Sequence, residues 1–187
     1  MNTTKRGFTL IELLVVIAIL AVLATAVVVI LNPAQLIKQG RDSTRISDLA
    51  ALHSAIALYL SDVTTANLTT TSTCTVGTTQ PGGVALSCAT NATTVTTGSG
   101  WVSANFRAIS SGSPLSRLPL DPVNDSTYFY AFESVASPTN TFEIDAMMES
   151  NKYSSSTTAT SVTLNVKDGG NNDNWYEIGN DPGLDLF

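Results

Sequence analysis

The chain has 187 residues, a net charge of −6 and an apolar share of 43%. This length allows one modest domain with a core of its own beside a short additional segment. The acidic balance argues against nucleic acid as a partner, since such binding requires a basic surface. His53 is the one histidine, and there is no catalytic triad, phosphate loop or dinucleotide fingerprint. The composition therefore predicts a protein that is not an enzyme.

The chain begins with a short basic leader followed by an apolar run. Lys5 and Arg6 precede residues 8–31, in which Glu12 is the only charged residue. A helix of roughly 20 apolar residues spans a bilayer, and basic residues on one flank keep that end in the cytoplasm. We expect a single membrane pass with the rest of the chain outside the cytoplasm. A secretory signal fits less well, because its apolar stretch is only about 7–15 residues long.

The residues around Gly7 resemble a known processing motif. Gly7 ends the leader, Phe8 follows it, and Glu12 lies four residues further on. This arrangement is similar to the N-terminus of type IV pilins and type II secretion pseudopilins. The resemblance implies that prepilin peptidase removes residues 1–7 by cleaving between Gly7 and Phe8, and that it methylates the new amine of Phe8. It also implies polymerisation with other copies of the chain by an inner-membrane assembly platform.

Glu12 is costly in this position. A carboxylate within a membrane segment costs roughly 2.5–3.5 kcal/mol on insertion scales, so it is a functional candidate. In an assembly of shifted subunits, the amine of Phe8 from one copy can pair with Glu12 of another, and only one stagger satisfies both charges. The alternative is that Glu12 reaches the headgroups from near the helix end. We expect assembly to be its role.

Beyond the apolar run, the pattern predicts that the helix continues over residues 32–60 as an amphipathic half. Pro33 predicts a kink or local opening, because proline lacks a backbone donor and disfavours helix at the residue before it. Apolar residues then recur at three- and four-residue steps, which is the spacing of one helix face. This stripe consists of Ile46, Leu49, Leu52, Ile56 and Leu60.

Residues 61–100 are rich in threonine and serine, which predicts a long loop with short strands. Cys74 and Cys88 lie in this segment and are the only cysteines of the chain. An even pair in an exported domain indicates a disulfide. Closing a loop of about 15 residues stabilises the fold by roughly 3 kcal/mol on the chain-entropy model.

The C-terminal part of the predicted head, residues 61–187, contains alternating patterns typical of strands. With the resemblance, they predict an α+β, pilin-like fold in which the long N-terminal helix packs on a small antiparallel sheet. The predicted strands are residues 128–132, 142–149 and 162–167. Glu143, Asp145 and Glu149 alternate with apolar residues, and we expect them to be solvated on the outer face.

Residues 168–174 are rich in oxygen ligands, which calcium prefers. Asp168, Asn171 and Asp173 are the candidate ligands. Major pseudopilins bind calcium in a C-terminal loop, so the resemblance favours this interpretation, whereas ordinary turn formation is the alternative. No other cofactor is expected.

The resemblance implies a structural subunit of a type IV pilus-like filament. Its precursor is expected in the bacterial inner membrane, in contact with lipid, and the processed chain in an extracellular pilus. The alternatives are a type II secretion pseudopilin that forms a short periplasmic pseudopilus, a minor tip or adhesive pilin, and an anchored domain that does not assemble.

Overall fold

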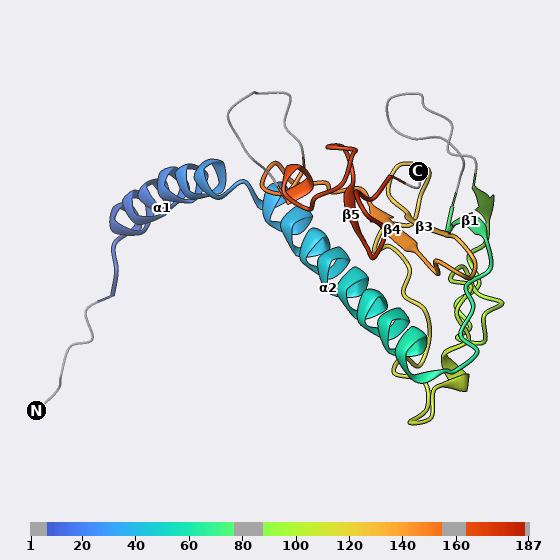
Figure 1. Ribbon diagram of the computed structural model, residues 1–187. Coiled ribbons are helices and arrows are strands. Elements are labelled where there is room, and N and C mark those ends of the chain that lie inside the picture. Colours follow the sequence, from blue (N-terminus) through green and yellow to red (C-terminus); the bar gives the residue numbers. More distant parts are fainter. Residues whose placement is uncertain (1–6, 77–87, 155–163, 186–187) are drawn as a thin grey trace, which may run out of the picture. The chain divides into compact units, whose positions relative to one another are not determined.

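The computed structural model describes residues 7–76, 88–154 and 164–185 (Figure 1). The chain divides into two compact units, Met1–Ile37 and Lys38–Phe187. The helices are Leu10–Leu31 (α1), Pro33–Asp62 (α2) and two short 3₁₀ helices, Phe106–Ala108 (η1) and Leu164–Val166 (η2). The strands are Thr71–Cys74 (β1), Ala89–Thr90 (β2), Tyr130–Ser134 (β3), Phe142–Ala146 (β4) and Tyr176–Gly179 (β5).

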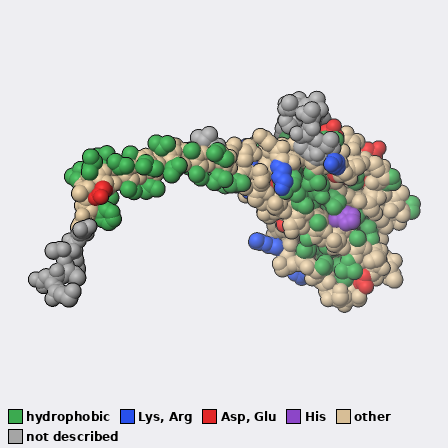
Figure 2. Space-filling view, turned by 90° about the vertical axis from the view of Figure 1, so that its left-hand side faces the viewer, with side chains coloured by type: hydrophobic (Ala, Val, Ile, Leu, Met, Phe, Trp, Pro, Cys, Tyr) green, Lys and Arg blue, Asp and Glu red, His purple; other side chains and the backbone are tan. Residues whose placement is uncertain are grey.

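α1 is apolar on all sides, so its sequence marks no single face for burial. Its large apolar side chains are exposed, from 48% at Val15 to 82% at Leu10, and Figure 2 shows apolar side chains along its length. The segment Leu10–Val28 is long and apolar enough to cross a membrane, judged by length and composition. A helix of this kind requires lipid or other apolar helices around it.

A single residue separates α1 from α2. Asn32 adopts a left-handed conformation with φ of 42° and ψ of 72°, which ends α1. Pro33 then occupies the first position of α2, where a missing N–H is no loss because that group has no partner within a helix. The Asn32 carbonyl accepts a hydrogen bond from Gln35 N at 2.9 Å. The interruption falls where Pro33 predicted it.

α2 packs its apolar stripe on one face of the sheet (Figure 1). Leu49, Leu52 and Ile56 of the predicted stripe are fully buried, and Ile46 and Leu60 at its ends are half-buried. Burying each large apolar side chain contributes about 1.5–3 kcal/mol. The core is completed by Trp101, Val102, Phe106, Ile109, Leu118, Tyr130, Phe132, Phe142 and Ile144.

The sheet has the strand order β2-β1-β3-β4-β5. The pairs β1–β3, β3–β4 and β4–β5 are antiparallel, as predicted. β2 instead pairs with β1 in parallel, so the whole sheet is mixed. Cys74 and Cys88 form a disulfide with their Cα atoms 5.7 Å apart, which places the start of β2 beside the end of β1.

The predicted strand at 162–167 is wrong for its described part. Residues 162 and 163 lie outside the described residues, and Leu164–Val166 form the 3₁₀ helix η2. Asn165 is the buried residue of η2 and Val166 is exposed, the reverse of what the apolar alternation indicated. The edge strand next to β4 is β5, where Glu177 alternates with the half-buried Tyr176 and Ile178.

A buried arginine joins three parts of the head. Nε and Nη2 of Arg45 donate to the two oxygens of Asp121 at 2.5 and 2.9 Å. Nη1 lies 2.8 Å from Asp42 Oδ1 and 2.7 Å from Glu149 Oε1. Asp42 also accepts the backbone N–H groups of Glu149 and Ser150 at 2.9 and 2.8 Å. This Arg45 cluster (Arg45, Asp42, Asp121 and Glu149) therefore ties α2 to the loop before β3 and to the chain after β4.

The charges of the Arg45 cluster shift the pKa values of Arg45 and Glu149. Burial works to lower the pKa of Arg45, but the hydrogen bonds and charge of Asp121, with Glu149 and Asp42, leave it raised. Burial works to raise the pKa of Glu149, but the guanidinium groups of Arg41 and Arg45 leave it below its ordinary value. Both shifts favour the ionised forms of Arg45 and Glu149.

We predict that Arg45→Met destabilises the head severely. Removing one partner of a buried ion pair costs about 3–5 kcal/mol, because the remaining charges stay buried without compensation. The measurement is urea unfolding of the full chain in detergent micelles, followed by near-UV circular dichroism. Arg41→Met is the matched control, since the Arg41 side chain is 33% exposed and forms an ion pair only with Glu149 among the described residues, and solvent screening limits the contribution of a partly exposed pair to about 1 kcal/mol. Equal losses for the two variants would contradict the prediction.

Candidate functional site

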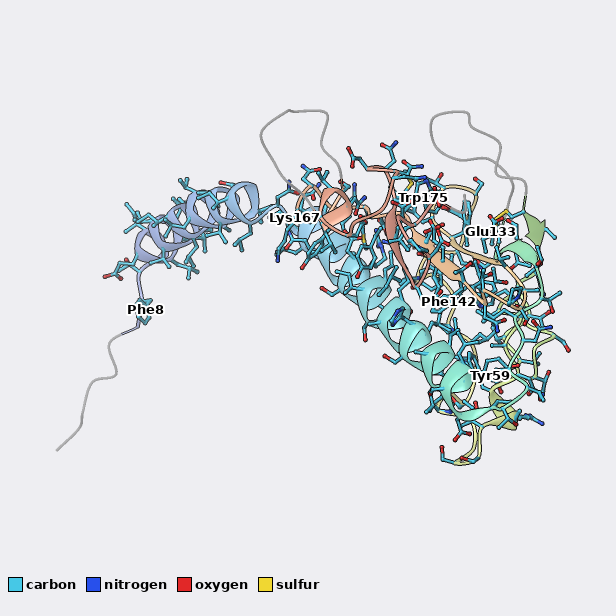
Figure 3. The ribbon with its side chains drawn as sticks, viewed as in Figure 1. Phe8, Tyr59, Glu133, Phe142, Lys167 and Trp175 are labelled. Carbon is cyan, nitrogen blue, oxygen red and sulfur yellow. A yellow bond between two sulfur atoms is a disulfide. The ribbon has the colours of Figure 1, made fainter. Side chains whose placement is uncertain are left out.

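The predicted cleavage point lies immediately before α1. Phe8 is 92% exposed, and Figure 3 shows it just before the first turn of the helix. Gly7 is also exposed, and a Cβ built on it would meet no atom within 4 Å. The rest of the predicted leader lies outside the described residues. The bond between Gly7 and Phe8 is thus accessible to a peptidase in this unit.

Thr9 and Glu12 form a reciprocal capping box at the start of α1. Thr9 is the N-cap, and its Oγ1 accepts a hydrogen bond from Glu12 N at 3.3 Å. Glu12 Oε2 in turn accepts from Thr9 N and from Thr9 Oγ1, both at 2.8 Å. The box satisfies backbone N–H groups that the first turn of a helix otherwise leaves without partners. The Thr-x-x-Glu spacing is a known sequence signal for such a box, so this contact was readable from the sequence, although our sequence analysis missed it.

The capping box leaves part of the Glu12 carboxylate available. Oε1 of Glu12 accepts no hydrogen bond from the described residues. The side chain lies at the N-terminal end of α1, where the helix dipole favours a negative charge. Glu12 is the acidic residue of the first turn of α1. Glu12 therefore combines a local anchor through one oxygen with an exposed second oxygen that can accept a donor from another chain.

The comparisons with known proteins bear on this N-terminal segment. A family model described as the prokaryotic N-terminal methylation motif matches residues 2–28. The chain therefore carries the prepilin signature of type IV pilins and pseudopilins, a structural class of proteins. The resemblance predicted from the sequence is confirmed in this segment. Comparison with curated proteins and with solved structures gave no match.

The predicted calcium loop forms an ordered turn. Asp168 Oδ1 accepts from Gly170 N at 3.1 Å, and Asp168 Oδ2 accepts from Glu177 N at 3.0 Å. Burial raises the pKa of Asp168, although these hydrogen bonds oppose the shift. Asn171 and Asp173 are exposed. The contacts give Asp168 a role in positioning the chain, and calcium binding by this loop stays a prediction.

The expectation that Glu143, Asp145 and Glu149 are solvated is wrong. Their exposures are 0%, 3% and 8%. Glu149 belongs to the Arg45 cluster, whereas Glu143 and Asp145 lie on the face of β4 opposite α2. A second buried apolar cluster includes Ala131, the cross-strand partner of Asp145, and in it Phe129 and Trp175 pack edge to face at 5.4 Å. Strand alternation reports that one face is apolar, but it does not show that the other face is covered too.

Glu143, Asp145 and Glu177 come together on this second face of the sheet. Each offers a carboxylate oxygen, and these oxygens lie within 4.8 Å of one another. Burial and the neighbouring carboxylates raise the pKa of Glu177 to about 8, and they hold the pKa of Asp145 well above its ordinary value. We call these three residues the β4–β5 acidic cluster. The sequence analysis missed it because Glu177 lies outside the strands that it predicted.

We predict that Thr9→Ala frays the first turn of α1. Loss of an N-cap side chain costs about 1 kcal/mol, so the amides of the first turn should exchange several times faster with solvent. The measurement is hydrogen–deuterium exchange of the full chain in detergent micelles, read by NMR at single residues. Thr9→Ser retains the hydroxyl and is the control that should exchange like the wild type. Unchanged exchange in Thr9→Ala would show that the box does not hold the helix end.

Proposed function

We propose that this chain is a structural subunit of a type IV pilus-like filament and carries out no catalysis itself. The observation that supports the proposal is an apolar helix, exposed on all sides, that carries the prepilin signature and a single acidic side chain. Prepilin peptidase is the expected processing partner. It would cleave between Gly7 and Phe8 and methylate the amine of Phe8.

The two compact units correspond to the two environments of such a subunit. In the precursor, α1 lies in the inner membrane among lipid chains, with the head of residues 61–187 outside the cytoplasm. The assembly platform then transfers α1 from lipid into a bundle of the same helices from other copies. Both surroundings are apolar, which suits a helix that has no polar face. The acidic head remains at the filament surface.

Glu12 sets the stagger between copies in this proposal. Its Oε2 is held by Thr9 of its own chain, while Oε1 is available to the positively charged amine of Phe8 from a neighbouring copy. A pair of opposite charges in an apolar bundle is strongly oriented, since removing either partner leaves a buried charge. The stagger that brings the two groups together is therefore preferred over other stagger distances.

We predict that filaments sheared from the surface of the native cells contain a chain that begins at methylated Phe8. Intact-mass spectrometry of this fraction and of the membrane and periplasmic fractions is the measurement. An abundant processed species in the sheared fraction supports a pilus, and a scarce one supports a minor tip subunit. A processed species confined to the periplasm or membrane would identify a type II secretion pseudopilin instead. A chain that still begins at Met1 in every fraction would refute processing and leave an anchored domain.

We predict that Glu12→Ala and Glu12→Gln both block assembly. The filament yield should fall by about tenfold or more, which corresponds to about 1.4 kcal/mol in the assembly step. Processing at Gly7 and membrane insertion should persist in both variants, and immunoblots of the sheared and membrane fractions measure these outcomes. Glutamine can still cap the helix but carries no charge, so Glu12→Gln separates the two roles of Glu12. Normal filaments from Glu12→Gln would show that Glu12 acts through the capping box alone.

A further inference from the structure

The β4–β5 acidic cluster places like charges together in the interior of the head. Asp145 and Glu177 are direct cross-strand partners in the β4–β5 register, and Glu143 lies two residues from Asp145 on the same face of β4. All three side chains are at least nine-tenths buried. Like charges that face each other across strands destabilise a sheet, and a buried carboxylate requires a compensating partner. The cluster therefore needs positive charge from a proton or a cation.

The protein supplies no side-chain cation to two of these carboxylates. Asp145 and Glu177 make no ion pair with a basic side chain among the described residues. The charged neighbours that act most strongly on Asp145 are acidic, namely Glu143, Glu177 and Glu133. In the Arg45 cluster, by contrast, buried carboxylates of the same kind surround a guanidinium group. The two buried clusters differ in the source of their positive charge.

A second observation points to a ligand at the β4–β5 acidic cluster. Asp145 Oδ1 is fully buried and accepts no hydrogen bond within the described structure. Buried polar atoms in proteins are almost always partnered. An ionised carboxylate oxygen only accepts, so its missing partner is a hydrogen-bond donor or a metal ion. The side chain that carries this oxygen belongs to the group of three.

The spacing of the three carboxylates fits one ion of calcium's size. Calcium binds oxygen ligands at about 2.3–2.6 Å, so two ligands on opposite sides of one ion lie about 4.6–5.2 Å apart. The ligand oxygens of Glu143, Asp145 and Glu177 lie within 4.8 Å of one another. Magnesium demands a near-ideal octahedron at about 2.0–2.1 Å and usually keeps several waters, whereas calcium accepts a flexible set of oxygen ligands. The all-oxygen character of the group also favours a hard cation over a transition metal.

The loop at 168–174 holds one of these carboxylates in place. Glu177 Oε2 accepts from Asn172 N at 3.0 Å, and Glu177 N donates to Asp168 Oδ2 at 3.0 Å. Gly170 approaches so closely that a Cβ on it would lie 1.9 Å from Glu177 Oε2. Only glycine fits at this position without displacing the carboxylate. The loop thus orients Glu177 toward the cluster in the way that outer-shell groups orient metal ligands.

We propose that Glu143, Asp145 and Glu177 bind one divalent cation of calcium's size on the sheet face opposite α2, with the loop at 168–174 positioning Glu177. The cation neutralises carboxylates that β4 and β5 bring together, and it connects the edge strand to the centre of the sheet. This site is separate from the N-terminal helix, so it does not depend on the proposed filament function.

The test is calcium titration of the full chain in detergent micelles after treatment with a chelator. Calorimetry should give one site per chain, and calcium should raise the melting temperature because it binds the folded state. The double variant D145N/E177Q keeps the shape of both side chains and removes their charges. The double variant should bind calcium about tenfold or more weakly than the wild type. Without calcium it should melt at the same temperature as the wild type or higher, because the repulsion between the carboxylates is removed. Asp173→Asn is the control that should bind like the wild type.

Terbium luminescence gives a second measurement that does not depend on the double variant folding. Terbium replaces calcium at oxygen sites, and Trp175, two residues before Glu177, should sensitise its emission. Trp175→Phe should remove most of this emission, and added calcium should compete it away from the wild type.

Three outcomes would overturn the proposal. Absence of calcium heat, melting shift and terbium emission in the wild type would mean that protons alone occupy the cluster. Calcium binding that D145N/E177Q retains and Asp173→Asn loses would place the site in the loop. If the double variant melts well below the wild type when both are free of calcium, Asp145 and Glu177 stabilise the fold themselves and do not serve as calcium ligands.

Discussion

The contact of Arg45 with three carboxylates determines where α2 sits on the head. The apolar stripe of α2 becomes fully buried only from Leu49 onward, so hydrophobic packing alone does not attach the turns before it. Asp42 and Arg45 attach those turns through directed hydrogen bonds to the loop before β3 and to the chain after β4. Ionic contacts of this kind have one good geometry, whereas an apolar stripe tolerates small shifts. The position at which the helix leaves the head therefore depends on a buried charge cluster.

α1 presents the opposite physical situation, since it has nearly no directional contacts. Its side chains are apolar around the whole circumference, and its one carboxylate is held by the N-cap of the same helix. A helix of this type packs equally well against lipid tails or similar helices, because both surroundings are apolar. Under the proposed function, α1 can move from the membrane into the filament because it packs equally well in both surroundings. Glu12 then sets the register between copies, which apolar packing does not determine. Under the proposed function, buried charges position α2 on the head, whereas apolar packing and the single charge of Glu12 position α1 in the filament.

The sequence predicted those elements that are determined by residues close together in the chain. The apolar run, the break at Pro33, the helix stripe and the position of β4 follow from spacing over a few residues. The Arg45–Asp121 contact joins residues 76 positions apart, and no local pattern indicates it. The strand expected at 162–167 is wrong for its described part, because an alternation over so few residues is too short to establish a strand by itself. The burial of Glu143 and Asp145 required knowledge of a second layer, which depends on how segments distant in sequence fold over the sheet.

The two buried carboxylate clusters differ in where their compensating positive charge comes from. Around Arg45 the positive charge is part of the chain, so that attachment persists in any medium at neutral pH. Around Asp145 the described residues supply the backbone N–H of Asn172 to Glu177 but no basic side chain to Asp145 or Glu177, so under the proposal a cation from the medium supplies the positive charge. The second arrangement lies at β5, an edge of the sheet, where β4 is the one neighbouring strand within the described sheet. An ion there adds a contact between β4 and β5 that hydrogen bonds at an edge do not provide. Under the proposal, the cation would add stability to the last strand of the head, while the attachment of α2 would not depend on the cation.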